Sequence, residues 1–428
     1  MSSTLVSFRT CSMTPLFLGL FASPAGSTST LDVEPTPNPP GSESLLRGVE
    51  AISDDEAWAV GTVQPPSYDN LTLIAHYVNG AWHVVPSPSP DASCTDGNVE
   101  YGGNRLNSLA VVSPSDIWAV GTSCLELNTL TEHWNGSSWT IVPSPSPLAE
   151  NILSDVEALA PNDVWAVGYT EEDIGAGTLV EHWNGSSWSV VPSPKPGTGG
   201  MLGGVDAVSV ADVWAAGSYY NESEGLWETL ITHWNGSTWS EVPSPSPGTY
   251  TNALGGVAVV SANDAWVVGS YSSGGGVLTL AEHWDGHDWT VVPTPNVATG
   301  YGTSNTIGSV VARSANDVWA AGSFQNQSTG HQSRTLLLHW DGTSWSIVPS
   351  PSPGASSDLS DIAFGPSGAV WGVGIYSEYP IDIYDGHYTL AQALTLGTGP
   401  DQPLDPPRHR VRTLRKGLGS GPLLRSPD

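Results

Sequence analysis

A tryptophan followed three residues later by a glycine recurs seven times along this chain. These tryptophans are Trp58, Trp118, Trp165, Trp214, Trp266, Trp319 and Trp371, and successive ones are 47 to 60 residues apart. Short β-type segments lie between them, and no segment has the periodicity of a helix. A repeat of this length, with several short strands in each unit, indicates one large repetitive domain.

The third unit shows the pattern of one repeat. It contains β-type segments at 155–160, 164–169, 178–183 and 187–191, which are separated by polar turns and one variable loop. Asn184-Gly185 favours a type I′ hairpin turn, because both residues tolerate a positive φ. Four antiparallel strands in each of seven units predict an all-β fold, namely a seven-bladed β-propeller.

Prolines indicate the radial order of the strands. The fourth segment of the third unit runs into Pro192-Ser193-Pro194. Proline belongs at a sheet edge because it cannot donate a backbone hydrogen bond. We therefore expect the fourth strand of each blade to be outermost and the first, which is rich in small residues, to line the centre.

The two ends of the repeat region predict how the ring closes. The seventh unit departs from the pattern after Tyr384-Asp385-Gly386, where no tryptophan and no Pro-Ser-Pro follows. Residues 31–39 match the fourth strand and proline segment at 139–147, with Leu31 in the place of Trp139. We expect this N-terminal segment to be the fourth strand of blade seven.

The termini differ in composition from the repeats. Arg9, the apolar run 15–22 and the small residues that follow predict a signal peptide at 1–25, and hence a secreted or cell-surface protein. No later run approaches the ~20 apolar residues of a membrane helix, so we expect no membrane insertion. The propeller is expected at 26–390. The segment 391–428 is predicted to be a disordered basic tail, unless it results from a shifted reading frame.

Charge narrows the range of partners. The chain has a net charge of -30, and residues 31–400 contain five basic residues against 39 acidic ones. Such a surface repels nucleic acid and anionic membranes, and self-repulsion favours a monomer. It could attract Ca²⁺, although a solvated acidic exterior explains the same composition and no cofactor is expected.

The repeats resemble those of a known group of proteins. The patterns S-x-N-D-V-W-A-V-G, T-L-x-E-H-W-N-G-x-x-W and V-P-S-P-x-P are similar to the tryptophan-rich propeller repeats of exported bacterial proteins, which are kelch-like or galactose-oxidase-like. The resemblance covers about residues 31–390 and implies the propeller fold. The double glycine of kelch repeats is missing, and no Cys-Tyr pair with gathered histidines indicates copper chemistry.

A histidine and an acidic residue also recur, and both invite a metal-binding interpretation. The histidines are His76, His133, His182, His233, His283 and His339, and the turn acids are Asp116, Asp163, Asp212, Asp264 and Asp317. Equivalent positions in different blades lie far apart around a ring, whereas a metal needs its ligands within ~2.3 Å of one ion. We expect each histidine to form a hydrogen bond within its own blade, each acid to serve its turn, and no metal site.

Variation between the repeats identifies a candidate binding surface. The loops after the second strands and the loops between blades differ in every unit, and we expect both sets on one face of the ring, the variable face. The regular Asn-Asp and Asn-Gly turns then lie on the opposite, constant face. Trp227 is the one tryptophan outside the repeat, and Tyr219, Tyr220, Glu222 and Glu224 lie near it. Aromatic and carboxylate groups together indicate a sugar-binding site.

Two cysteines are expected to lie together on the same face. Cys94 is in the long loop that enters the second blade, and Cys124 is in that blade's loop after the second strand. In an exported protein this placement predicts a disulfide. Two free thiols are the alternative.

These observations predict a non-enzymatic extracellular binding module that recognises a protein or a glycan through its variable loops. One alternative is a carbohydrate-active enzyme, a glycosidase or lyase, that uses paired loop carboxylates. The carboxylates concerned are Glu171, Glu172, Asp173, Glu222 and Glu224. Another alternative is a purely structural surface protein.

Overall fold

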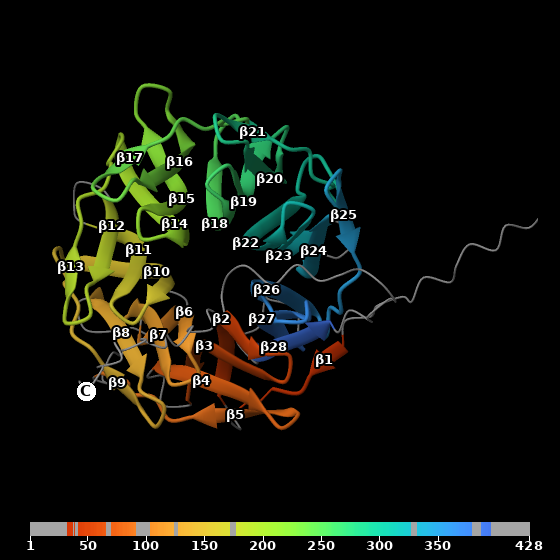
Figure 1. Ribbon diagram of the computed structural model, residues 1–428. Coiled ribbons are helices and arrows are strands. Elements are labelled where there is room, and N and C mark those ends of the chain that lie inside the picture. The colour runs from red at the N-terminus through yellow and green to blue at the C-terminus, as the bar shows by residue number, and fades with distance from the viewer. Residues whose placement is uncertain are drawn as a thin grey trace, which may run out of the picture.

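The computed structural model describes residues 32–36, 38, 42–65, 70–90, 103–123, 127–171, 177–326, 332–378 and 387–394. The sheets are arranged in a ring (Figure 1), and a cavity lies at its centre. The expected signal peptide, the expected tail beyond 394, and Cys94 and Cys124 lie outside the described residues. The signal peptide, the tail and the disulfide therefore stay predictions.

The described strands form four-stranded antiparallel sheets that fit seven propeller blades. Blade 1 is β2 (Glu43–Ser53), β3 (Glu56–Gln64), β4 (Leu71–Val78) and β5 (Ala81–Val85); blade 2 is β6 (Arg105–Ser113), β7 (Asp116–Thr122), β8 (Thr129–Trp134) and β9 (Trp139–Ile141). Blade 3 is β10 (Glu150–Ala160), β11 (Asp163–Glu171), β12 (Gly177–Trp183) and β13 (Trp188–Val190); blade 4 is β14 (Thr198–Ser209), β15 (Asp212–Asn221), β16 (Leu226–Trp234) and β17 (Trp239–Glu241).

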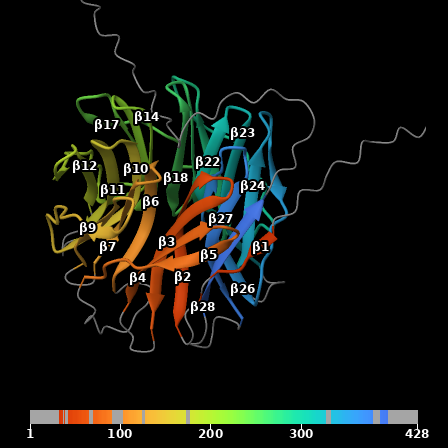
Figure 2. The same cartoon turned by 60° about the horizontal axis from the view of Figure 1, so that its bottom comes forward.

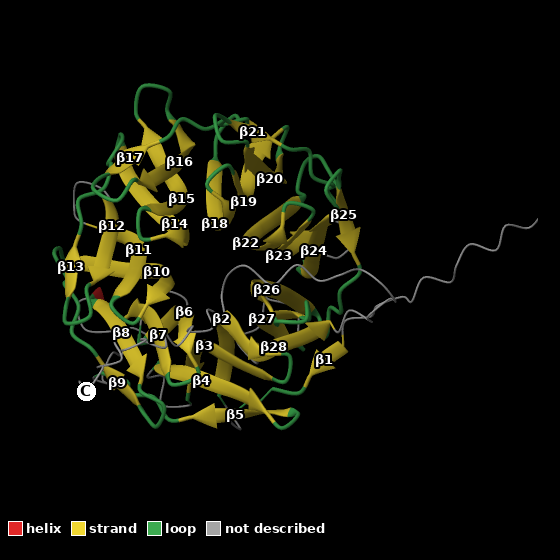
Figure 3. Ribbon diagram, in the orientation of Figure 1, coloured by secondary structure: helices red, strands yellow, loops and turns green. Residues whose placement is uncertain are grey.

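The remaining blades follow the same order, and one parallel pairing of Val277 with Ser304 joins the sheets of blades 5 and 6. Blade 5 is β18 (Asn252–Ser261), β19 (Asp264–Ser273), β20 (Gly276–Trp284) and β21 (Trp289–Val291); blade 6 is β22 (Ser304–Ser314), β23 (Asp317–Gln325), β24 (Arg334–Trp340) and β25 (Trp345–Val348). Blade 7 is β26 (Ser356–Phe364), β27 (Val370–Ser377), β28 (His387–Leu394) and β1 (Asp32–Glu34). Strands and loops make up nearly all of the described chain (Figure 3). The strands of blade 1 run from one face of the ring to the other, so the loops that connect them lie on these two faces (Figure 2).

The N-terminal strand completes blade 7, as the sequence predicts. β1 pairs with β28, and Val33 lies opposite Gln392 just as Val190 lies opposite Glu181 in blade 3. The outermost strand of the last blade therefore comes from the beginning of the chain. The ring is closed by backbone hydrogen bonds between segments more than 350 residues apart.

The third strand of blade 7 lies later in the chain than the sequence pattern suggests. Tyr384-Asp385-Gly386 imitates the Trp-Asn-Gly turn that ends a third strand, but β28 begins only at His387. Its Thr389 and Leu390 occupy the places of the Thr-Leu pair that starts the other third strands. The expected domain boundary at 390 therefore falls inside β28.

A hydroxyl clasp fastens the outer segment of each blade. The threonine near the start of the third strand bonds to a hydroxyl in the segment after the fourth strand, for example Thr178 to Ser193 at 2.8 Å. In blade 7 the partners are Thr389 and Thr36, whose hydroxyl oxygens are 2.7 Å apart. The Pro-Ser-Pro segments therefore supply bonding hydroxyls as well as blunting the sheet edge.

Each Trp-x-x-Gly motif is required by a bulge in the neighbouring strand. The first strand of every blade contains a register shift, and it presses a carbonyl against the glycine of the second strand. A Cβ on Gly168 would lie 1.9 Å from the oxygen of Ile152, and one on Gly61 would lie 2.0 Å from that of Leu45. No side chain fits at this position.

Tryptophans fill the spaces between neighbouring blades. Trp165 is 2% exposed, and its ring lies 5.0 Å from that of Trp234 and 5.5 Å from that of Trp239, both in the next blade. At the seam of the ring, Trp371 of blade 7 packs against Tyr77 and Trp82 of blade 1. The aromatic contacts therefore continue across the closure.

The hairpin turns correct one prediction from the sequence. Asn79 and Gly80 both have positive φ, as a type I′ turn requires. In blade 3 only Gly185 does, and Asn184 begins a four-residue loop, because its side chain accepts hydrogen bonds from the backbone N–H groups of Ser186 and Ser187. The Asn-Gly pair therefore forms an Asx turn there and not a type I′ turn.

A chain that begins at residue 42, and so lacks β1, should unfold at a Tm roughly 5–10 °C lower than the full chain. Its β28 would expose unpaired backbone groups, and Thr389 would lose its clasp. Circular dichroism measures the transition, and a chain that begins at residue 26 is the control. An unchanged Tm for the shorter chain would contradict the closure by β1.

Candidate functional site

The variable face carries both sets of irregular loops, as expected. In blade 4, the backbone N–H of Trp227, just after the loop between β15 and β16, donates to the carbonyl of Tyr250 in the loop that leads to blade 5. The side chain of Asn252 also donates to the carbonyl of Trp227, at 2.9 Å. Loops after second strands and loops between blades therefore meet on one face.

Two of the five predicted sugar-binding residues are in contact with each other. Tyr220 and Trp227 are cross-strand partners, and their rings meet edge to face with centroids 5.8 Å apart. A Cβ on Gly199 would lie 3.2 Å from the edge of the indole, so Trp227 rests against the start of β14. This support orients a half-buried aromatic pair on the variable face.

The other three predicted residues are placed differently. Tyr219 neighbours Tyr220 on the strand and so points to the opposite face of the sheet, where its hydroxyl donates to Glu228 at 2.5 Å. Glu222 and Glu224 lie in the exposed turn between β15 and β16. They follow Tyr220 along the chain and are not part of a buried cluster.

Two further tyrosines lie on the variable face and were not predicted from the sequence. Tyr250 is 75% exposed and Tyr301 is 85% exposed, and they lie in the two successive loops that join blades 4, 5 and 6. The blade repeat requires neither ring. An aromatic residue in a loop between blades was the available signal. We call Tyr220, Trp227, Tyr250 and Tyr301 together the aromatic surface.

The carboxylates proposed for an enzyme are exposed where the structure describes them. Glu171 is the exposed last residue of β11, and Glu222 and Glu224 are exposed in the turn of the next blade. Glu172 and Asp173 lie outside the described residues. The structure therefore leaves the paired-carboxylate interpretation as an alternative.

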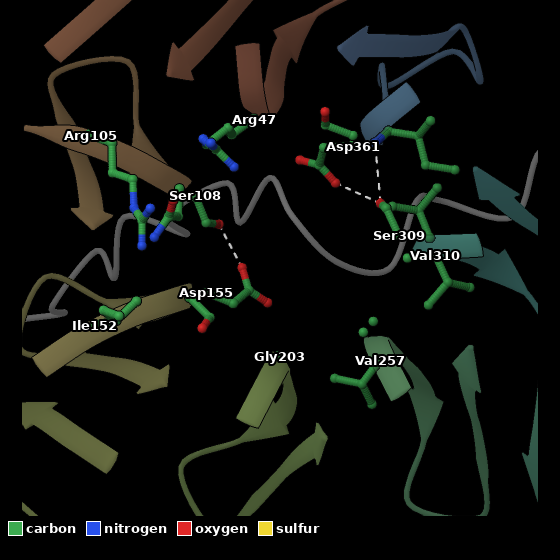
Figure 4. A pocket seen from close by; sticks show the side chains of 18 of the residues that line it. Arg47, Arg105, Ser108, Ile152, Asp155, Gly203, Val257, Ser309, Val310 and Asp361 are labelled. Atoms are coloured by element: carbon green, nitrogen blue, oxygen red, sulfur yellow. Dashed lines mark hydrogen bonds between the residues drawn. The ribbon is translucent and has the colours of Figure 1, made fainter. Parts of the chain in front are cut away.

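A cavity of about 760 Å³ occupies the central channel. Asp155 connects three blades there, because it accepts hydrogen bonds from the Ser108 hydroxyl of blade 2 at 2.5 Å and from the backbone N–H of Val205 in blade 4 at 2.8 Å. Asp361 of blade 7 likewise accepts bonds from Ser309 of blade 6 and from Val49 of blade 1. Figure 4 shows these aspartates at the cavity wall.

Enclosure in the ring changes the acidity of these aspartates. Burial raises the pKa of Asp361 to about 7, although its hydrogen bonds favour the charged form. Burial also raises the pKa of Asp155. Both carboxylates hold adjacent blades together, which gives them a structural role.

The recurring histidines form hydrogen bonds within their own blades, as predicted. His182 Nε2 lies 2.7 Å from Asp163, and the other five histidines lie 2.8–2.9 Å from the equivalent acid of their blade. Each ring also packs on the second-strand tryptophan, as His182 does on Trp165. The turn acids therefore serve as histidine partners. Among the described residues, no three His, Cys, Asp or Glu side chains are grouped so as to hold a metal ion.

Three third strands bury a glutamate that has no hydrogen-bond partner among the described residues. Glu132, Glu181 and Glu282 are fully buried, and burial raises the pKa of each to about 8. Gln392 takes the same place in blade 7. These side chains are therefore neutral in the folded protein below that pH.

Comparison with solved structures bears on the fold. YCF48 bound to D1 peptide matches with a TM-score of 0.52 and 14% identity, over 87% of this chain and 98% of that one. YCF48 from Cyanidioschyzon merolae gives a TM-score of 0.51 and 15% identity, over 85% and 98%. The chain is a tryptophan-rich β-propeller.

A further match at the level of fold is an enzyme. A PL25 ulvan lyase bound to -[GlcA(1-4)Rha3S]- gives a TM-score of 0.50 and 10% identity, over 78% of this chain and 91% of that one. No protein-family model and no curated protein sequence matches this propeller significantly. Among the described residues, no helix of this propeller is long and apolar enough to cross a membrane.

The buried glutamates predict that the protein loses stability as pH rises. The folded state holds a proton on each up to about pH 8, whereas the unfolded chain releases it near the ordinary value of 4.5. The loss of folding stability that these glutamates cause is therefore absent below pH 4.5. It grows as the pH rises to about 8 and is constant above that pH.

Replacing all three with glutamine should leave Tm unchanged near pH 4 and raise it by roughly 5 °C or more at pH 8, because glutamine cannot ionise. Thermal unfolding at the two pH values measures the effect, and the exposed Glu224→Gln is the control. An equal gain at both pH values would refute a role for ionisation.

Proposed function

We propose that this protein is a non-enzymatic binding module, secreted or held at the cell surface, that recognises a glycan through the aromatic surface of its variable face. It acts as a monomer without a cofactor, and it belongs with the kelch-like or galactose-oxidase-like propellers of exported bacterial proteins. The single observation that carries the proposal is the exposure of Tyr250, whose carbonyl accepts a hydrogen bond from the backbone N–H of Trp227, and of Tyr301 in the next loop between blades. The fold uses neither exposed ring.

The chemistry of this surface fits a polar, neutral ligand with apolar faces. Tyrosine and tryptophan provide large, rigid contact areas that lose little conformational entropy on binding. The exposed carboxylates of Glu222 and Glu224 can accept hydrogen bonds from hydroxyl groups. A net charge of -30 disfavours polyanionic ligands at an acidic surface of this kind.

A protein partner is the other class of ligand that the variable face would suit. Exposed tyrosine and tryptophan are also common in the centre of protein interfaces. The glycan proposal is preferred because the rings lie in separate loops of successive blades, along which an extended saccharide chain can lie. Lack of binding to any glycan would favour the protein partner or the structural role.

We expect the full chain to bind one class of glycan saturably on a glycan array. Trp227→Ala and Tyr250→Ala should each weaken that binding at least tenfold, equivalent to roughly 1.4 kcal/mol, because a central aromatic contact is lost. The control is Val210→Ser, which changes a residue that is 61% exposed on the constant face. Glycan binding that survives both aromatic substitutions would disprove the assigned surface.

A further inference from the structure

The central channel is lined differently on its two sides. The register shift in each first strand places one extra residue at the channel wall. In order from blade 1 to blade 7, these residues are Arg47, Asn107, Ser154, Gly203, Gly255, Gly308 and Ser360. Six are small or short and polar, which suits a crowded axis. Arg47 is the exception.

A second arginine lies beside the first. Arg105 is the first residue of β6, and its equivalents in the other blades are Leu45, Ile152, Met201, Ala253, Thr306 and Asp358. No other blade has a basic residue there. The blade scaffold therefore requires an arginine at neither position, although these two are among only five basic residues between 31 and 400.

The two arginines come from neighbouring blades and reach the same part of the cavity. Figure 4 shows both side chains on the side of Ser108, with Gly203 across the cavity from them. Arg105 begins β6 and Tyr169 lies near the end of β11, so both are toward the variable face. All three side chains line the cavity.

The two aspartates that line the cavity, Asp155 and Asp361, are already engaged by neighbouring blades. Both oxygens of Asp155 and both oxygens of Asp361 accept hydrogen bonds from neighbouring blades. A guanidinium has five N–H donors in a planar fork, so it can hold an oxyanion while it also contacts protein groups.

We propose that the mouth of the central channel binds a sugar acid, whose carboxylate is held by Arg47 and Arg105. Tyr169 offers a hydroxyl to the sugar, and Leu45 and Ile152 supply apolar wall beside it. A cavity of about 760 Å³ lies within the usual range of small-ligand sites, roughly 300–1,000 Å³. The site is separate from the aromatic surface and does not depend on it.

Isothermal titration calorimetry on the full chain tests this site. The probes are D-glucuronate, sulfate and D-glucose at equal ionic strength, which distinguish a sugar acid from a free inorganic anion and from a neutral sugar. We expect saturable binding of glucuronate, weaker binding of sulfate, and none of glucose. Binding of sulfate alone, or of neither anion, would overturn the proposal.

Variants locate the site within the channel. Arg47→Gln and Arg105→Gln should each weaken glucuronate binding at least tenfold, while the exposed Lys195→Gln, which removes the same charge elsewhere, should not change it. Arg105→Lys keeps the positive charge but not the planar fork of donors, so it should weaken glucuronate binding severalfold. This variant tests the site even if Arg105→Gln does not fold. Undiminished binding in these arginine variants would refute the site.

Trp227→Ala separates the two proposals. It should keep full glucuronate binding even where it abolishes binding on the glycan array, because Trp227 lies in blade 4 outside the channel lining. Loss of glucuronate binding in Trp227→Ala would mean that the two surfaces form one site, contrary to the inference.

Discussion

In six of the seven blades, one buried tryptophan packs against two aromatic rings of the next blade, and these contacts hold the ring together. Trp165 contacts Trp234 and Trp239 in this way, and Trp371 does the same across the seam with Tyr77 and Trp82. Trp319 of blade 6 packs instead on aliphatic side chains of blade 7. These contacts need every blade to have a neighbour on both sides, so the ring has to close. Closure by β1 is therefore a consequence of the same constraint that shapes the blades.

The repeat explains most residues, and those that it does not explain gather in two places. Tyr250 and Tyr301 are exposed on the variable face, where the Tyr220–Trp227 pair also lies, and none of these rings is part of the inter-blade packing. Arg47 is the exception among the small or short polar residues at the bulge positions of the channel wall. The recurring residues are sufficient to form and pack the blades. Residues that depart from the repeat are therefore available for binding.

Much of the fold could be predicted from the sequence, because each blade repeats the same chemistry. The match of residues 31–39 to the fourth strand of blade 2 at 139–147 correctly identified the N-terminal strand, whereas Tyr384-Asp385-Gly386 imitated a turn and hid the position of β28. The site was harder to predict. Trp227 could be identified because it is the one tryptophan outside the repeat. The positions of Tyr301 on the variable face and of Arg47 in the channel depend on how a loop and a bulge are placed in space, which the sequence does not show.

Hydroxyl-radical footprinting of aromatic side chains shows directly whether a glycan binds at the aromatic surface, because it does not require the ligand to be known in advance. The full chain is oxidised with and without a panel of polysaccharides. A bound polysaccharide is expected to protect Trp227, Tyr250 and Tyr301 while Trp234 and Trp284 on the constant face react as before. Protection confined to the constant face, or none with any polysaccharide, would contradict this expectation.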